Sequence, residues 1–177
     1  MSKAAELAAF IGGGSTGKIL QVQHTQFTGT NTISGTSGAD STFTDLTVNI
    51  TPTSTSSIIH LQAHVFGEHG EDNSNVYNHT FFFFRDTTKL AHPTAGSRNI
   101  GISMATRTFY QEDDASTPEV ARFDYFDSPS STSQITYKVG LVPRVDGDFF
   151  LNRTADDTDS IIHERGVSFI SATEIAG

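Results

Sequence analysis

Apolar side chains recur at every second position along much of this chain, which is the period of a β-strand with one buried face. In residues 123–141 the alternation runs through Phe123 and Tyr125, stops at residues 127–131, and resumes at Ile135. The interruption, DSPSS, consists of residues that end strands and close turns. The stretch therefore predicts two strands separated by a turn.

Other segments show the same strand character. Residues 58–66 are partly apolar on both faces, which indicates a central strand. Residues 81–84 are all phenylalanine, and both faces of this strand need cover because neighbouring side chains point to opposite sides. Further strands are predicted within residues 19–23, 43–50, 76–85, 100–110, 149–151 and 166–175, with 25–40 as a strand continuation or long loop and 67–75 as a polar loop.

About eight to nine such strands, without alternating helices, predict an all-β protein. The expected fold is an antiparallel β-sandwich, most simply a jelly roll, with a short N-terminal helix. We assign the sandwich domain to residues 18–177 and the helix with its Gly/Ser linker to residues 1–17.

The predicted helix covers residues 2–11. Ser2 is a capping residue, and residues 12–14, all glycine, end the helix. A helix this short is marginal alone in water, so its apolar stripe needs a partner: the rest of the domain, copies of itself, or another protein. The residues expected to anchor or oligomerise the chain are Leu7, Phe10 and Ile11, which share the stripe with Ala4.

Residues 12–18, GGGSTGK, have the composition of a phosphate-binding loop but not its context. That motif needs Ser or Thr after the lysine, where this chain has Ile19. It also follows a strand and opens a helix, whereas this segment follows a predicted helix and opens a predicted strand. We therefore interpret it as a flexible linker.

The charge balance narrows the range of partners. The chain has 11 Lys and Arg against 20 Asp and Glu, a net charge of −9, and no basic stripe, which argues against binding nucleic acid through its phosphates. It has no cysteine, and therefore no disulfide, thiolate metal site or cysteine nucleophile. Because no apolar run approaches the roughly 20 residues of a membrane span, we expect no membrane insertion. No signal-peptide core is found at the N-terminus, so we expect no secretion by the usual route.

Histidine and carboxylate side chains are the candidate metal ligands of this chain. His60 and His64 share one face of a strand, but about 13 Å separates them along it, too far to ligate one ion. Two acidic clusters, at residues 112–114 and 156–159, offer the oxygen ligands that calcium prefers, without an EF-hand pattern. We expect solvated acidic loops and no metal or other cofactor, with calcium as the open alternative.

The sequence shows no catalytic motif, and it supports a sugar-binding surface better than an enzyme active site. No Gly-x-Ser-x-Gly elbow occurs, and no pair of carboxylates can be assigned a role, so we expect no enzyme. Tyrosines beside Asn- and Asp-rich loops could stack on and hydrogen-bond sugars, although strand tyrosines are more often packing residues. The candidate ligand-binding loop residues are His69, Glu71, Asp72, Tyr110, Asp113 and Asp114.

Four stretches resemble small virion structural and tail-fibre-like proteins of marine tailed bacteriophages, of the cyanophage or pelagiphage type. They are MSKAAELA at residues 1–8, GKILQV at 17–22, ITPTSTSSII at 50–59, and YFDSPSSTSQITYKV at 125–139 together with RGVS at 165–168 and EIAG at 174–177. None of them is a catalytic motif, since they are predicted strands and turns. The resemblance therefore implies a scaffold rather than an activity.

The resemblance also implies a setting and partners. Related proteins form tail-fibre tips, fibre adaptors or other particle appendages, often as trimers, so it implies a homotrimer in the virion, made in the host cytoplasm and bound to other virion proteins. This chain has no collagen-like or coiled-coil stalk, which favours a compact appendage or capsid decoration subunit. The alternative is a lectin-like module that recognises host surface glycans, and a glycan depolymerase ranks last.

Overall fold

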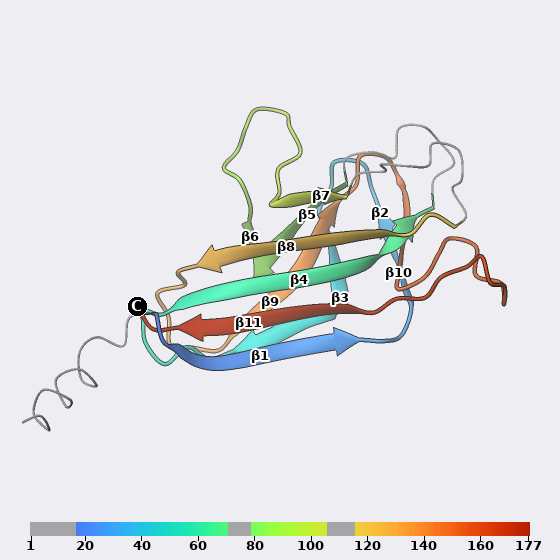
Figure 1. Cartoon of the computed structure of the whole chain (residues 1–177). Helices are drawn as coiled ribbons and strands as arrows, with labels where there is room; N and C mark the ends of the chain where they lie inside the picture. The colour runs from blue at the N-terminus through green and yellow to red at the C-terminus, as the bar shows by residue number, and fades with distance from the viewer. Residues whose placement is uncertain (1–16, 71–78, 106–115) are drawn as a thin grey trace, which may run out of the picture.

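Two antiparallel β-sheets packed face to face make up the described part of the chain (Figure 1). The computed structural model describes residues 17–70, 79–105 and 116–177, so the predicted N-terminal helix lies outside it. The strands are β1 (Ile19–Phe27), β2 (Asn31–Gly35), β3 (Ser41–Ile50), β4 (Ile58–His69), β5 (His79–Arg85), β6 (Thr88–Leu90), β7 (Ser103–Ala105), β8 (Glu119–Asp127), β9 (Ile135–Val142), β10 (Gly147–Leu151) and β11 (Ser168–Ile175). The predicted all-β sandwich is confirmed.

The chain crosses repeatedly between the two sheets. Sheet A contains β1, β11 and β4 side by side, with β8 along the other edge of β4 and with β10 and β2 continuing from its end. Sheet B contains β3, β9 and β5 side by side, with β6 and β7 along the other edge of β5. The order β1-β11-β4-β8 opposite β3-β9-β5-β6 follows the wrapping path of a jelly roll. The predicted turn at residues 127–131 lies in the segment that carries the chain from sheet A to sheet B.

The hydrophobic core lies between the sheets and is rich in phenylalanine. Phe81 and Phe83 point into it from β5 and are fully buried. Phe82 points to the other side of sheet B and is also fully buried. Its ring lies against Gly140 of β9, and the ammonium of Lys89 sits 4.0 Å from the ring centroid. Both faces of this strand are therefore covered within one chain, and no second copy is needed to bury these rings.

The structure departs from the predicted strands most clearly around β2 and in residues 100–105. Residues 31–35 form β2, although their Thr/Ser/Gly composition lacks strand alternation; the strand exists because it pairs with β10 and inserts Ile33 into the core. The long strand predicted at 100–110 is wrong within its described part. There a loop runs along β5, with Ile102 N–H donating to Phe81 O at 2.8 Å, and only the short β7 follows.

Both ends of the described chain lie at one edge of sheet A. Gly17 N–H donates to Ala176 O at 2.8 Å, and Ala176 N–H donates to Lys18 O at the same distance. In Figure 1 the C-terminus accordingly lies beside the start of β1. The first strand of the sandwich is thereby held to the last residues of the chain.

Candidate functional site: the outer face of sheet A

The side of sheet A that points away from the core carries aromatic and imidazole side chains. Alternate residues of β1, β4, β8 and β11 face the core, and the residues between them form what we call the outer face. The strand register aligns its centre in three rows: Arg122, His64, Phe169 and Gln26; Asp124, Gln62, Ser171 and His24; and Phe126, His60, Thr173 and Val22.

Two ring stacks stand on this face. His60 and Phe126 stack with ring centroids 4.3 Å apart and planes 8° apart, and His64 and Phe169 stack at 5.7 Å and 5°. Phe126 is nevertheless 59% exposed and Phe169 37% exposed. Cross-strand neighbours fix the position of each phenylalanine, and most of the ring surface of Phe126 still meets water.

Polar contacts hold the histidines in place. Arg122 Nε donates to His64 Nδ1 at 2.8 Å, and His60 Nε2 lies 3.4 Å from Asp124 Oδ2. Burial, together with the Arg122 charge, lowers the pKa of His64 below its usual value. His64 is therefore a neutral acceptor at neutral pH, with its own proton on Nε2.

The charge of the outer face differs from that of the whole chain. The chain carries a formal net charge of −9, whereas on the same count, which gives histidine no charge, the three rows contain one arginine and one aspartate. Further apolar side chains border the rows, with Val120 on β8 at 49% exposure and Ile19 on β1 at 60%. The outer face is thus electrically neutral and partly apolar on an acidic molecule.

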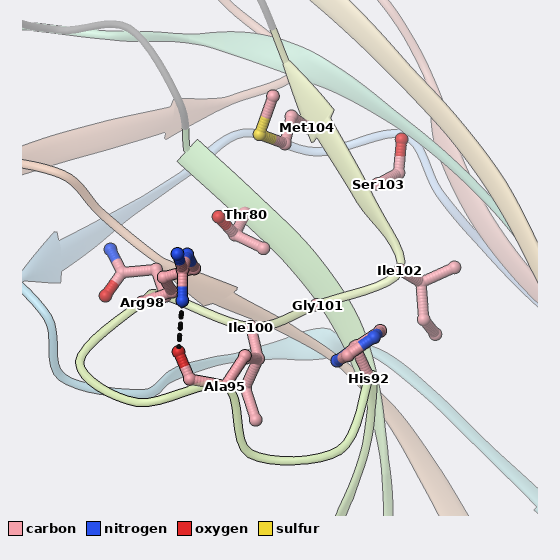
Figure 2. Close-up of a pocket in the computed structure, with 10 residues that line it drawn as sticks. Thr80, His92, Ala95, Arg98, Ile100, Gly101, Ile102, Ser103 and Met104 are labelled. Atoms are coloured by element: carbon pink, nitrogen blue, oxygen red, sulfur yellow. Dashed lines mark hydrogen bonds between the residues drawn. The ribbon is translucent and has the colours of Figure 1, made fainter.

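A hollow of about 550 Å³ lies on the other sheet, between the start of β5 and residues 92–104 (Figure 2). Gly101 allows the loop to lie close to β5, since a Cβ there would stand 2.2 Å from Thr80 Cγ2. Arg98 Nη1 donates to Ala95 O at 3.1 Å, which holds the loop in its curved course. Thr80, His92, Arg98, Asn99 and Ser103 supply polar groups, and Ala95, Ile100, Gly101, Ile102 and Met104 complete the lining.

The predicted site residues fall largely outside the described part of the chain. This holds for the anchoring residues Leu7, Phe10 and Ile11, and for Glu71, Asp72, Tyr110, Asp113 and Asp114. His69 is described, but it lies in strand β4 rather than in the predicted loop, since β4 extends to His69. Its side chain is buried and faces His79 between the sheets.

Sequence reasoning missed the outer face. Residues 123–127 were interpreted by their inward positions, Phe123 and Tyr125, and the outward Phe126 received no role. The sequence did carry one sign of this surface: aromatic side chains and histidines stand at outward strand positions, where the solvated face of a sheet normally carries other polar residues. Register across four strands was needed to bring these positions together, and register is not visible in one sequence.

Two buried carboxylates were also missed, and both fasten loops to the sandwich. Glu174 accepts hydrogen bonds from Gln21 Nε2, from the N–H and hydroxyl of Thr53, and from Ser57 Oγ, at 2.6–2.7 Å. Glu68 accepts bonds from the N–H and hydroxyl of Thr117 and from Ala155 N–H, each at 2.8 Å. Every oxygen of these carboxylates is used internally, which indicates structural roles.

Metal ligands do not gather in the part of the chain that the structure describes. No group of three or more His, Asp or Glu side chains there could hold an ion. In the acidic segment 156–159, Asp157 pairs with Arg165. The segment 112–114 lies outside the described residues.

Within the described residues, no helix is long and apolar enough to cross a membrane.

Comparison with known proteins gives a distant structural likeness. No family model matches the chain, and no curated protein matches it. Among solved structures it is similar to the crystal structure of the infectious bursal disease virus VP2 subviral particle, at 11% sequence identity and a TM-score of 0.35. The match covers 90% of this chain and 42% of that chain, so this chain spans less than half the length of the structure it matches. A likeness this distant does not identify a function.

Proposed function

We propose that the chain is a non-enzymatic structural subunit of a virus particle, and that its copies associate through the outer face of sheet A. The observation that carries the association is the exposure of Phe126 and Phe169 on a face without net charge. The sequence resemblance to virion proteins of marine tailed phages supports the setting, as a tail appendage or a capsid decoration subunit. It also supports three as the number of copies.

The chemistry of the outer face fits a second copy of the same chain. Copies with a net charge of −9 repel one another over most of their surfaces, but not where Arg122 and Asp124 balance. Four strands of eight or so residues give a face of roughly 20 by 25 Å, about 500 Å² per copy. Two copies would together bury on the order of 1,000 Å², the lower limit for a specific interface.

The mass of the purified protein in solution tests this association. We expect light scattering to give a multiple of the 19.1 kDa chain mass, and the double variant Phe126→Ser, Phe169→Ser to give a single chain. Both rings are partly exposed, so the sandwich should stay folded, and thermal unfolding checks this. A monomeric wild type, or a double variant that keeps its multiple mass, would show that the outer face is not the interface.

A matched control uses apolar residues away from the sheets. Ile161 and Ile162, in the connection between β10 and β11, are 99% and 60% exposed. The variant Ile161→Ser, Ile162→Ser loses comparable apolar surface and should keep the mass of the wild type. If this variant becomes monomeric instead, the interface lies in that connection.

Mass spectrometry of purified particles from infected cells tests whether the chain is part of a virus particle. Absence of the chain from the particles would contradict that part of the proposal.

A glycan-binding role is the second candidate, and the hollow beside β5 favours it. Its volume of about 550 Å³ lies in the range of small-molecule sites, and it combines Arg98, Asn99 and Thr80 with apolar side chains. The Arg98 guanidinium suits an acidic sugar. On a glycan array we expect binding, if present, to depend on Arg98 and to be lost in Arg98→Ala; an array on which the wild type binds nothing removes this candidate.

A further inference from the structure

Two histidines face each other across the interior at one end of the sandwich. His69 ends β4 in sheet A and His79 begins β5 in sheet B, and each continues the row of core residues on its strand. Their rings stack with centroids 4.2 Å apart and planes 27° apart. His69 is 9% exposed and His79 3% exposed, so the stacked pair closes the core at this end.

The enclosure gives these rings little that could hold a positive charge. Both nitrogens of His69 and Nε2 of His79 have no hydrogen-bond partner among the described residues. His79 Nδ1 accepts a long hydrogen bond, 3.4 Å from Arg144 N, which requires this nitrogen to be unprotonated. A proton added to either ring would therefore create a buried charge without an acceptor, and such burial is costly.

The charged groups on the neighbouring elements do not supply that acceptor. Asp148 of β10 favours a protonated His69, but no hydrogen bond joins its carboxylate to the ring. Glu68 points to the opposite side of β4, where loop groups donate to it, and Glu119 of β8 pairs two positions before the histidine. The side chain of Arg144, after β9, is exposed, and the short strands β2 and β7 carry no charged residue.

Both rings are consequently neutral in the folded protein at neutral pH. Burial lowers the pKa of His69 to about 4, although Asp148 acts in the opposite direction. Burial, and then the neighbouring His69, lowers the pKa of His79 to about 3. Protonating both would place two like charges in rings whose centroids lie 4.2 Å apart, in an interior where charges are poorly screened.

We propose that the stacked pair His69–His79 is an acid-sensitive switch, and that its protonation separates the end of β4 from the start of β5. At neutral pH the uncharged rings pack together and hold sheet A to sheet B. In acid the rings bind protons far more readily in water than in the core, so acid favours the state in which this end is open. The opening stays local, because Glu174 and its hydrogen bonds lie beside Ile59, at the other end of β4.

The closed and open states bind protons at different pH. In the open state each ring has the ordinary histidine pKa of 6.5, whereas in the closed state the two pKa values are about 4 and about 3. The stabilisation of the closed state is therefore complete above pH 6.5 and is lost as the pH falls toward these lower values. Between pH 7 and pH 4.5 the equilibrium constant for opening should rise by about 10² for each ring, on the order of 10³–10⁴-fold for the pair.

Native-state hydrogen exchange of the full chain tests this switch. With the pH dependence of intrinsic exchange taken into account, the amides of residues 67–70 and 79–81 should lose protection on the order of 10³–10⁴-fold between pH 7 and pH 4.5. The amides of residues 58–61, at the other end of β4, should keep their protection. Unchanged protection of residues 67–70 and 79–81 would overturn the proposal. Equal losses at both ends would also overturn it, because acid would then unfold the whole sandwich.

Ring-for-ring substitution separates protonation from packing. The double variant His69→Phe, His79→Phe keeps two rings at this end and removes both titrating groups, so its protection should be the same at pH 7 and pH 4.5. His79→Phe alone should retain a loss of about 10²-fold, and it carries the test if thermal unfolding shows that the double variant does not fold.

The matched control removes two histidines from the outer face. His24→Gln with His60→Gln should keep the full response of the wild type, because neither side chain lies between the sheets. A response that survives in the double phenylalanine variant, or that disappears in the control, would overturn the proposal. The readout does not depend on the association of copies, so this inference stands or falls apart from the proposed function.

Discussion

At the scale of single residues, buried carboxylates hold the loops of the sandwich. Burial by itself would raise the pKa of Glu174, but hydrogen bonds from Gln21, Ser57 and Thr53 outweigh it and lower the pKa to about 2. The unfolded chain, in which this carboxyl has its ordinary pKa of 4.5, therefore takes up the proton first as the pH falls. The contribution of Glu174 to stability is complete above pH 4.5 and is lost as the pH falls toward 2.

Replacing this carboxylate should remove that acid-dependent stability. We expect Glu174→Gln to cost about 3 kcal/mol at pH 7 and much less at pH 2.5, following the linkage of about 1.4 kcal/mol per pKa unit. Urea unfolding at the two pH values measures the difference. The control is Asp159→Asn, at an exposed loop position, which should leave the free energy of unfolding unchanged at both. If Glu174→Gln lowers the free energy of unfolding equally at both pH values, the loss does not come from the ionised carboxylate.

The burial of Phe82 depends on a missing side chain. A Cβ on Gly140 would stand 2.4 Å from Phe82 Cε2, a distance that requires the ring to move. We expect Gly140→Ala to destabilise the protein by about 1–3 kcal/mol in chemical unfolding. In a Phe82→Leu background the same substitution should cost less, because the ring it meets is gone. Equal costs in both backgrounds would show that the glycine serves the backbone rather than the ring.

At the scale of elements, β8 and β9 belong to different sheets and are joined by a buried polar contact. Asp127 at the end of β8 accepts hydrogen bonds from Tyr137 of β9 at 2.7 Å and from Arg85 of β5 at 2.9 Å. Burial and the hydrogen bond to Asp127 raise the pKa of Tyr137 well above its usual value. This contact pins one end of sheet A to sheet B.

Removing a single hydroxyl tests the strength of that contact. We expect Tyr137→Phe to lower the free energy of unfolding by about 1–3 kcal/mol, since the Asp127 carboxylate loses a donor while the ring still fills the core. Tyr125→Phe is the control, at a tyrosine that also packs against the core. If the two substitutions cost the same, the bond to Asp127 contributes nothing specific.

The limits of sequence reasoning are also clearest at this scale. Residues 135–141 were predicted correctly from their alternation, which reflects one buried face, and residues 58–66 from apolar side chains on both faces, which indicate a central strand. The short strands were predicted less well. Residues 25–40, which contain β2, were left open as a strand or a loop, the strand predicted at 100–110 is reduced to β7 in its described part, and β6 was not predicted. Short strands at sheet ends form through their pairing partners and not through their own pattern. The outer face and the His69–His79 pair were invisible for the same reason. Each is assembled from strands distant in sequence, and a single sequence does not show which strands meet.

At the scale of the whole molecule, the net charge opposes the association of copies and the outer face favours it. A net charge of −9 drives copies apart over long distances, while the neutral face attracts at contact. Salt reduces only the first effect substantially, since the screening length falls from about 30 Å at 0.01 M to about 8 Å at 0.15 M.

Association should therefore strengthen with salt. We expect sedimentation equilibrium to give a lower dissociation constant at 0.15 M than at 0.01 M sodium chloride. An interface held by ion pairs would show the reverse. Arg122→Gln with Asp124→Asn, which keeps the face neutral, should preserve the salt effect, and loss of the effect in this variant would contradict its origin in net charge.

The hydrogen bonds between Gly17, Lys18 and Ala176 bring the first and last described residues to one corner of sheet A. A peptide or protein cargo fused after Gly177 would consequently emerge beside the point where residue 17 enters the sandwich. The far end of the sheets, with the connection that carries Ile161, would stay clear of such a fusion. If the chain is used as a display scaffold, a fusion after Gly177 and an insertion in that connection would place cargo at opposite ends of the sandwich.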